Sequence, residues 1–216
     1  MTTRGKFILF EGLDRSGKTT QSTRLVDHLN KAGKHTVLMK FPNRETPIGK
    51  MIDSYLTNKT DVDDRMIHLM FTMNRWEEMT AFHQYIHAGV NVVMDRFSYS
   101  GVAYSAAKNI ITFEWCIQAE EGLPKPDIVL FMDMPNTSLR PGWGEERYER
   151  SEFQQKVRAV FKCIEELEST RWFNVDADES REKVEEQVRD IVTPRLTMEM
   201  GPLNYNYFSE YARISF

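Results

Sequence analysis

Apolar and polar positions alternate along this chain with two different periods. Five short apolar runs have the length of buried strands and are bounded by polar or turn-forming residues. They are Lys6–Glu11, Thr36–Lys40, Val90–Met94, Ile128–Asp133 and Trp172–Val175. The stretches between them have helical character and comprise Lys18–Ala32, Ile48–Leu56, Asp61–His87, Tyr99–Gln118, Glu152–Glu168 and Arg181–Met198. Strands that alternate with helices predict an α/β fold, in which a five-stranded parallel sheet carries helices on both faces.

Several segments mark boundaries within this pattern. Asp61, followed by Asp64, resembles a helix start. The segment Asn136–Gly144 is polar and contains glycine and proline, which predicts a loop. The last residues, Gly201–Phe216, are too aromatic for a solvated tail, so we expect them to dock on the body of the protein or on a partner. The chain contains no repeat or low-complexity segment, and we expect one domain spanning residues 1–216.

The composition is that of a globular protein without an excess of positive charge. The 216 residues carry a formal net charge of −4, which disfavours binding to nucleic acid through a basic surface. Cys116 and Cys163 lack the spacing of metal ligands, so we expect reduced thiols in a reducing compartment. There is no room for a signal peptide before the first strand, and no apolar stretch approaches the roughly 18 residues of a membrane span. We therefore expect a soluble cytoplasmic protein, and a nuclear pool is compatible with the same features.

A phosphate-binding motif follows the first predicted strand. The sequence Gly12-Leu13-Asp14-Arg15-Ser16-Gly17-Lys18-Thr19 fits the Walker A pattern and lies between a strand and a helix. Its glycines let successive backbone N–H groups converge on a phosphate at the start of a helix. We expect Lys18 to contact the β- and γ-phosphates of a nucleotide and Thr19 to hold Mg²⁺.

The third predicted strand ends in an acid and a base, Asp95 and Arg96. Ligands of open α/β sheets bind beyond the carboxyl ends of the strands. Asp95 is therefore placed to support Mg²⁺ through water, and the guanidinium group of Arg96 suits a phosphate. The alternative is an ion pair on the surface at the end of a strand, but the neighbouring Walker A motif favours the functional interpretation.

One further motif has a simpler explanation. Asn58-Lys59-Thr60-Asp61 matches the signature with which GTPases read guanine. It follows a helical stretch instead of a strand, and the only D-x-x-G sequence lies inside the Walker A motif itself. A turn between helices explains these residues.

Five segments together resemble the thymidylate kinase family of the eukaryotic and poxvirus type. They are Glu11–Gln21, Phe41–Arg44, Asn74–Glu77, Asp95–Lys108 and Gly122–Asp127, and the resemblance extends from about Arg4 to about Pro194. It implies transfer of the γ-phosphoryl group of ATP to dTMP, giving dTDP, on a P-loop fold with a lid at about residues 134–148. It also implies a homodimer formed through the helices predicted at Ile48–Leu56 and Asp61–His87.

The resemblance implies an ATP site formed by Arg15, Ser16, Gly17, Lys18, Thr19, Thr20 and Arg140. The implied catalytic residues are Arg15, Lys18, Asp95 and Arg96. Arg15 would act as a built-in arginine finger on the transferring phosphoryl group, although an exposed arginine without a role is the alternative. Arg140, in the lid loop, would stack on adenine.

The resemblance also extends the implied magnesium site. Thr19 would bind Mg²⁺ directly and Asp95 through water. Glu146 and Glu149 lie three residues apart and share a face if the segment is helical. They could then order water bound to the metal, or they could simply form a solvated acidic helix start.

The implied dTMP site comprises Asp14, Phe41, Arg44, Phe71, Arg75, Arg96, Ser100, Gly101, Tyr104, Tyr148 and Gln154. Arg44, Arg75 and Arg96 would hold the acceptor phosphate for in-line transfer. Asp14 would accept a hydrogen bond from the sugar 3′-hydroxyl, although an aspartate in a turn can also serve only to stabilise it.

Aromatic residues would surround the nucleoside. Phe71 would stack on thymine and Phe41 would form a neighbouring wall, although either ring alone is more typical of core packing. Tyr104 would lie beneath the deoxyribose and exclude a 2′-hydroxyl. Tyr148 and Gln154 would make further contacts with the base and the sugar.

Two other functions remain open from the sequence. A kinase acting on thymidine itself needs a general base near the 5′-hydroxyl, and Glu11 is the only candidate in the motif region. A P-loop switch protein without catalysis would bind or release partners depending on which nucleotide it holds, but the chain lacks the switch motifs.

Overall fold

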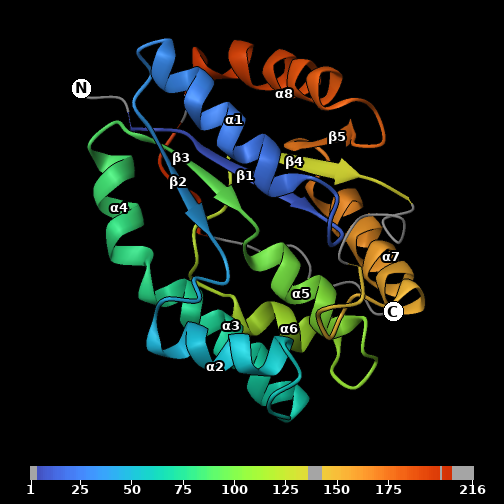
Figure 1. The fold of residues 1–216 in the computed structure, drawn as a ribbon. Helices are drawn as coiled ribbons and strands as arrows, with labels where there is room; N and C mark the ends of the chain where they lie inside the picture. Colours follow the sequence, from blue (N-terminus) through green and yellow to red (C-terminus); the bar gives the residue numbers. More distant parts are fainter. Residues whose placement is uncertain (1–3, 136–142, 200, 206–216) are drawn as a thin grey trace.

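The computed structural model describes residues 4–135, 143–199 and 201–205. Within these residues the strands form one parallel sheet with the order β2-β3-β1-β4-β5, seen in Figure 1. The strands are β1 (Phe7–Gly12), β2 (Thr36–Lys40), β3 (Asn91–Asp95), β4 (Ile128–Asp133) and β5 (Trp172–Asp176). Each strand lies within one residue of its predicted bounds, and the predicted fold class is confirmed.

Helices cover both faces of this sheet (Figure 1). They are α1 (Lys18–Lys31), α2 (Pro47–Leu56), α3 (Asp64–Glu77), α4 (Met79–His87), α5 (Ser98–Ala106), α6 (Phe113–Ala119), α7 (Ser151–Glu168) and α8 (Arg181–Leu196). Because successive residues of a strand point to opposite faces, β1 contributes Phe7 and Leu9 to one core cluster and Ile8 and Phe10 to another. The second cluster lies under α1 and α8, and the first under the remaining helices.

The register of the central strand positions the site. β1 pairs with β3 and β4, so that Phe10 lies opposite Asp95 and Gly12 opposite Met132. The carboxyl ends of these strands therefore meet at one edge of the sheet. The Walker A motif after β1 and the acid–base pair after β3 are brought together there, as their places in the sequence predict.

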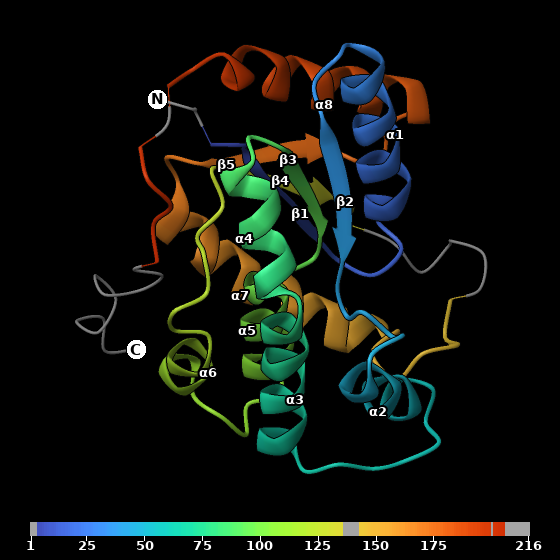
Figure 2. The same ribbon diagram turned by 90° about the vertical axis from the view of Figure 1, so that its left-hand side faces the viewer.

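The single helix predicted over Asp61–His87 is wrong, because the structure has two helices, α3 and α4. They separate at Glu78, whose N–H donates to the carbonyl oxygen of Arg75, three residues back, over 3.2 Å. Figure 2 shows α4 following α3 in nearly the same direction. A break of this kind barely interrupts the apolar period, so the pattern alone does not reveal it.

Two related predictions also need correction. α3 begins after Asp63, whose carboxylate accepts hydrogen bonds from the second and third residues that follow, so the start predicted at Asp61 is wrong. The helix predicted over Tyr99–Gln118 is divided into α5 and α6. Asn109, with a φ of 58°, turns the chain between them, and Thr112 caps the N-terminus of α6.

The described part of the C-terminal segment lies against the body of the protein. Arg4 Nε donates to the carbonyl oxygen of Gly201 over 2.8 Å, and the ring of Tyr205 lies 6.0 Å from that of His83 on α4. This agrees with the docking predicted for the aromatic tail; residues 206–216 lie outside the described range.

Two composition-based predictions can be compared with the fold. Cys116 and Cys163 are both free thiols, as predicted. Among the described helices, none has both the length and the apolar character to cross a membrane.

Candidate functional site

The P-loop, residues 12–19, turns tightly between β1 and the N-terminus of α1. Gly12 and Gly17 have positive φ angles of 142° and 90°, and a Cβ atom on Gly12 would lie 2.8 Å from the carbonyl oxygen of Met132. Glycine is required at such positions because other residues would be strained. The predicted ATP-site residues Ser16, Gly17 and Thr20 lie in this loop and the first turn of α1. Unpaired N–H groups at a helix N-terminus favour an anion here.

Lys18 folds over the P-loop and is almost fully buried. Its Nζ donates to the carbonyl oxygen of Leu13 and, over 3.2 Å, to Ser16 Oγ. Burial lowers the pKa of Lys18 to about 7, and the positive charge of Arg96 acts in the same direction. A phosphate oxygen would supply the opposite charge, so the geometry of Lys18 suits its predicted contact with the donor nucleotide.

Thr19 and Asp95 lie together at the carboxyl ends of the central strands. Thr19 Oγ1 donates to Asp95 Oδ2 over 2.5 Å, and Asp95 is 2% exposed. A hydroxyl and a carboxylate are oxygen ligands that Mg²⁺ takes beside nucleotide phosphates and water. Over the described residues there is no cluster of three or more His, Cys, Asp or Glu side chains that could hold a metal. Thr19 and Asp95 have the oxygen donors that suit such an ion.

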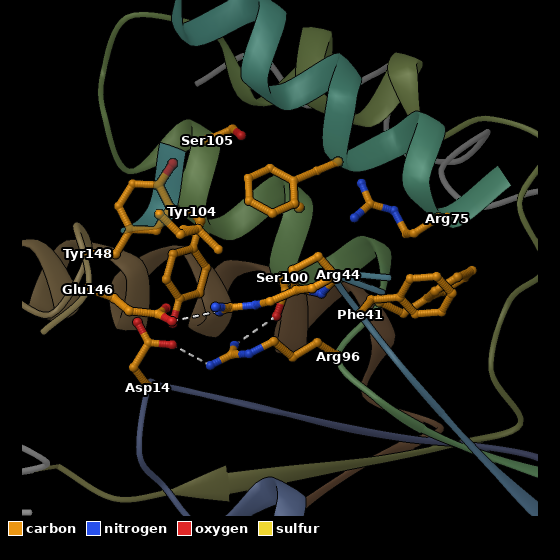
Figure 3. A pocket seen from close by; sticks show the side chains of 15 residues that line it. Asp14, Phe41, Arg44, Arg75, Arg96, Ser100, Tyr104, Ser105, Glu146 and Tyr148 are labelled. Atoms are coloured by element: carbon orange, nitrogen blue, oxygen red, sulfur yellow. Dashed lines mark hydrogen bonds and ion pairs between the residues drawn. The ribbon is translucent and has the colours of Figure 1, made fainter. Parts of the chain in front are cut away.

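Arg96 joins the P-loop to the helix on the other side of the site. It follows β3 with a φ of 67°, and its guanidinium group donates to the Gly12 carbonyl oxygen over 2.9 Å and to Ser100 Oγ over 3.1 Å. It also pairs with the carboxylate of Asp14, as Figure 3 shows. The ring of Tyr104 lies 5.3 Å from its Cζ. Arg96 is thus held between the P-loop and a neighbouring cavity.

This cavity opens beside the P-loop and is lined by residues from six segments of the chain. Its lining comprises Asp14, Phe41, Pro42, Arg44, Leu56, Phe71, Arg75, Arg96, Phe97, Ser100, Gly101, Tyr104, Ser105, Glu146 and Tyr148. All the predicted dTMP-site residues except Gln154 are among them. Figure 3 shows Asp14, Arg44, Arg96 and Glu146 gathered on one side of the cavity, while Arg75 and Ser105 lie on the opposite side. The cavity thus has one strongly charged side and an opposite side on which Arg75 and Ser105 lie.

Gln154 lies behind Asp14 instead of on the cavity wall. Its Nε2 donates to Asp14 Oδ2 over 2.7 Å, and its Oε1 accepts from the backbone N–H of Asp14 over 3.1 Å. The predicted contact of Gln154 with the base or the sugar is therefore not supported. Its contacts orient the carboxylate of Asp14 at the mouth of the P-loop.

Arg75 differs from the other two arginines that were predicted to bind the acceptor phosphate. Its side chain is 3% exposed, and its Nε and Nη2 both donate to the carboxylate of the fully buried Glu120. A Cβ atom on Gly101 would lie 2.5 Å from Arg75 Nη2, so this approach requires glycine. Because the charge of Arg75 is already balanced and lies on the side opposite Asp14 and Arg96, the geometry argues against a contact with the phosphate.

Comparison with known proteins agrees with this geometry. A family model described as Thymidylate kinase matches residues 10–188. The chain belongs to the thymidylate kinase family. It is 44% identical over 194 residues to a thymidylate kinase of Dictyostelium discoideum, covering 88% of this chain and 86% of that protein. It is 43% identical over 188 residues to human thymidylate kinase, covering 86% and 89% respectively.

A solved structure extends the comparison to the fold. The structure of a thymidylate kinase from Candida albicans matches with a TM-score of 0.81 and 36% sequence identity, covering 95% of this chain and 99% of that one. The resemblance inferred from sequence motifs is therefore confirmed over most of the chain.

In this member of the thymidylate kinase family, residues 143–149 form a turn that we call the lid stem. The segment is not helical, so the condition under which Glu146 and Glu149 would share a face is not met. Glu149 Oε2 accepts from the backbone N–H groups of Gly144, Glu145 and Glu146 over 2.9, 3.0 and 3.3 Å. Glu149 therefore closes the lid stem on itself.

Two arginines of the site are paired with carboxylates of the lid stem. Arg15 Nε donates to Glu149 Oε1 over 2.6 Å, and Arg44 donates to Glu146 over 2.6 Å and to Asp53 over 2.7 Å. The predicted role of Glu146 and Glu149 in ordering metal-bound water stays a prediction. Phosphate contacts by Arg15 and Arg44 require that these pairs exchange when nucleotides bind.

Aromatic rings form the rest of the cavity wall. Phe71 lies on α3 one turn before Arg75 and contributes to the lining, as does Phe41, whose ring lies 5.5 Å from that of Phe97. The ring centroids of Tyr104 and Tyr148 lie 5.5 Å apart, and both residues belong to the cavity lining. A flat, apolar ligand group fits between such surfaces. The predicted aromatic residues are thus brought together.

Glu11 does not reach the cavity. It is fully buried and accepts hydrogen bonds from the N–H groups of Phe97 and Ser100, at 3.1 and 3.0 Å, and from the Ser100 hydroxyl. Burial raises the pKa of Glu11, although these hydrogen bonds oppose the rise. Glu11 caps the first turn of α5, so the general base required for a thymidine kinase is not found at this position.

The sequence alone missed three polar residues around the cavity: His68, Ser105 and Glu120. Ser105 directly follows Tyr104 and belongs to the lining, so its position on the same helix was the one available signal. Glu120 and His68 contact residues that are distant in the sequence, so no local sequence pattern indicates them. Arg140, predicted to stack on adenine, lies outside the described residues.

Proposed function

We propose that the protein transfers the γ-phosphoryl group of ATP to dTMP, giving dTDP. The observation that carries this proposal is the position of the cavity. It lies directly beside a P-loop, carries arginines on the nearer side, and has aromatic walls around a space for a flat base. Membership of the thymidylate kinase family supports the same reaction.

The P-loop side is suited to hold ATP. Backbone N–H groups after β1 bind the donor phosphates, and Lys18 moves its ammonium group from the Leu13 carbonyl oxygen to a phosphate oxygen. Arg15 leaves Glu149 and approaches the transferring phosphoryl group. Phosphoryl transfer depends mainly on position and on neutralised charge, which these residues supply.

The acceptor lies in the cavity with its phosphate toward the P-loop. Arg96 already lies at that side and needs no rearrangement of the backbone, because it is anchored on Gly12 and Ser100. Arg44 exchanges Glu146 for the acceptor phosphate. The base then lies on the other side, between the aromatic walls and next to Arg75.

We propose Mg²⁺ as the cofactor of this reaction. The hydroxyl of Thr19 and the buried carboxylate of Asp95 would hold it, the latter through water. When bound, the ion would supply positive charge that balances the donor phosphates. The two side chains already lie in hydrogen-bond contact, so they are oriented before any ligand binds.

We further propose a homodimer through α2 and α3. Met66, Leu69, Met73 and Trp76 are exposed and recur every three or four residues, which places them along one side of α3. An exposed apolar stripe of this kind marks an interaction surface, and a second copy of the chain would cover it. Light scattering should find a dimer that Met73→Glu dissociates, whereas Ile110→Glu, at an equally exposed residue outside this face, leaves it intact.

A cytoplasmic location, with a nuclear pool compatible, remains a proposal from the sequence. Fractionation of the source cells with an antibody to the chain tests it. Recovery in a membrane or secreted fraction would contradict it.

Release of ADP with different acceptors tests the main proposal. The protein is incubated with ATP and Mg²⁺ and with dTMP, dUMP, thymidine, UMP or AMP. We expect rapid turnover with dTMP and none with thymidine. Turnover with thymidine alone would replace the proposal by a nucleoside kinase, and the absence of acceptor-dependent turnover would indicate a nucleotide switch. Lys18→Ala serves as the inactive control.

A further inference from the structure

His68 is a buried histidine with hydrogen-bond partners on both ring nitrogens. It lies on α3 and is 0% exposed. Its Nε2 is 3.1 Å from the carbonyl oxygen of Cys116, and its Nδ1 is 2.8 Å from Ser105 Oγ. The ring therefore connects the backbone of α6 to a hydroxyl group on α5 that belongs to the cavity lining.

The contact of Nε2 with the Cys116 carbonyl oxygen assigns the tautomer of His68, whose ring also lies near the backbone carbonyl group of Gly101. A carbonyl oxygen only accepts hydrogen bonds, so Nε2 must carry the hydrogen. Glu120 Oε1, 3.9 Å from the same nitrogen, favours the same assignment. Burial lowers the pKa of His68 to about 4, with the charge of Arg75 adding to the effect, so the ring is neutral near pH 7. Nδ1 then carries a lone pair.

The tautomer in turn fixes the direction of the Ser105 hydroxyl. A serine hydroxyl normally rotates to donate or to accept as its partner requires. Here its single hydrogen is directed to His68 Nδ1, so only its lone pairs remain for another partner. In the opposite tautomer, the Nε2 lone pair would face the lone pairs of the Cys116 oxygen at 3.1 Å.

The two polar groups on this side of the cavity have opposite hydrogen-bonding character. Arg75 offers N–H groups only, and Ser105 as oriented offers lone pairs only; Figure 3 shows both away from the charged side. Thymine and uracil present an acceptor, O4, next to a donor, N3–H. Cytosine presents the reverse, an amino group next to an N3 lone pair.

We propose that His68 is a specificity-determining positioning residue, which holds Ser105 as a hydrogen-bond acceptor and so selects bases that carry N3–H over cytosine. This rests on the proposed function, because it assumes that a pyrimidine nucleotide occupies the cavity. Cytosine would place its N3 lone pair against the lone pairs of Ser105. It would also direct its amino group toward the donors of Arg75.

Discrimination between acceptors tests this role. The ratio of kcat/KM for dTMP to that for dCMP is measured for the native protein, His68→Phe, Ser105→Ala and Ser105→Thr. Phenylalanine fills the buried space but releases the hydroxyl, which can then donate to cytosine N3. We expect the ratio to fall about tenfold to a hundredfold in His68→Phe and Ser105→Ala, the range for a buried polar group left without its partner. Ser105→Thr keeps the hydroxyl group and should therefore keep the native dTMP-to-dCMP ratio.

Two controls separate specificity from general damage. The ratio of dTMP to dUMP should stay constant in all variants, because both bases carry N3–H. Trp115→Phe disturbs the ring that packs 5.5 Å from His68 without changing its hydrogen bonds, and should leave the dTMP-to-dCMP ratio unchanged.

The outcomes are distinguishable. An equal loss for every acceptor, with an unchanged dTMP-to-dCMP ratio in His68→Phe and Ser105→Ala, would show a purely structural role and overturn the inference. If His68→Phe does not fold, the comparison of Ser105→Ala with Ser105→Thr decides. A native protein without activity on dTMP would overturn the proposed function, and the inference with it.

Discussion

Replacement of Glu120 by glutamine should destabilise the protein strongly. The Glu120 carboxylate accepts hydrogen bonds from Nε and Nη2 of Arg75 and, over 2.9 Å, from Thr72 Oγ1. The side chains of Glu120 and Arg75 are 0% and 3% exposed, so water cannot replace the lost charge. Removing one partner of a buried ion pair costs about 3–5 kcal/mol, because the other charge stays buried. Glu120→Gln also directs an amide N–H₂ group toward the donors of Arg75.

Urea unfolding measures this loss. The free energy of unfolding should fall by about 3 kcal/mol or more in Glu120→Gln, and replacing both residues by methionine should recover much of it. Asp61→Asn is the matched control, because Asp61 pairs with Arg147 at the surface and should change the free energy by less than about 1 kcal/mol. A loss below about 1 kcal/mol in Glu120→Gln would refute the reasoning.

Three further predictions follow from the P-loop and the lid stem. The pKa of Lys18 is lowered to about 7, and a phosphate partner raises it, so ATP binding near pH 7.5 should take up protons. The binding enthalpy measured by calorimetry should then vary with the ionisation enthalpy of the buffer. A binding enthalpy that is the same in all buffers would contradict this. Asp95→Asn should lower turnover about a hundredfold and raise the Mg²⁺ concentration at half-maximal rate, whereas an unchanged Mg²⁺ dependence would remove Asp95 from the metal site. Glu149→Ala should speed amide hydrogen exchange at residues 144–146 about tenfold, with residues of β1 as the unaffected control.

The strands were predictable because of the way a parallel sheet is buried. Both faces of β1, β3 and β4 carry helices, so their sequences are continuous apolar runs. The breaks between helices were not predictable from the same pattern. At Glu78 the backbone N–H bonds to the carbonyl oxygen three residues back and the apolar period continues, whereas Asn109 turns the chain with a positive φ.

The predictable part of the site consists of residues placed by local rules. The Walker A motif fixes Lys18 and Thr19, and the end of β3 fixes Asp95 and Arg96, because these follow strands that neighbour each other in the sheet. The partners of the arginines follow no such rule. Glu149 is 134 residues from Arg15, so its role depends on a tertiary arrangement that no spacing in the sequence encodes.

Burial explains why similar arginines are suited to different ends of the proposed acceptor. Arg44 and Glu146 are 38% and 33% exposed, so water compensates both groups when the pair opens, and a phosphate can take the place of the carboxylate at little cost. Arg75 and Glu120 have no such access to water, and separating them would leave two charges buried. The first pair can therefore exchange during each catalytic cycle, whereas the second must persist. A persistent pair contributes fixed N–H donors in place of net positive charge, which suits a neutral base and not a phosphate.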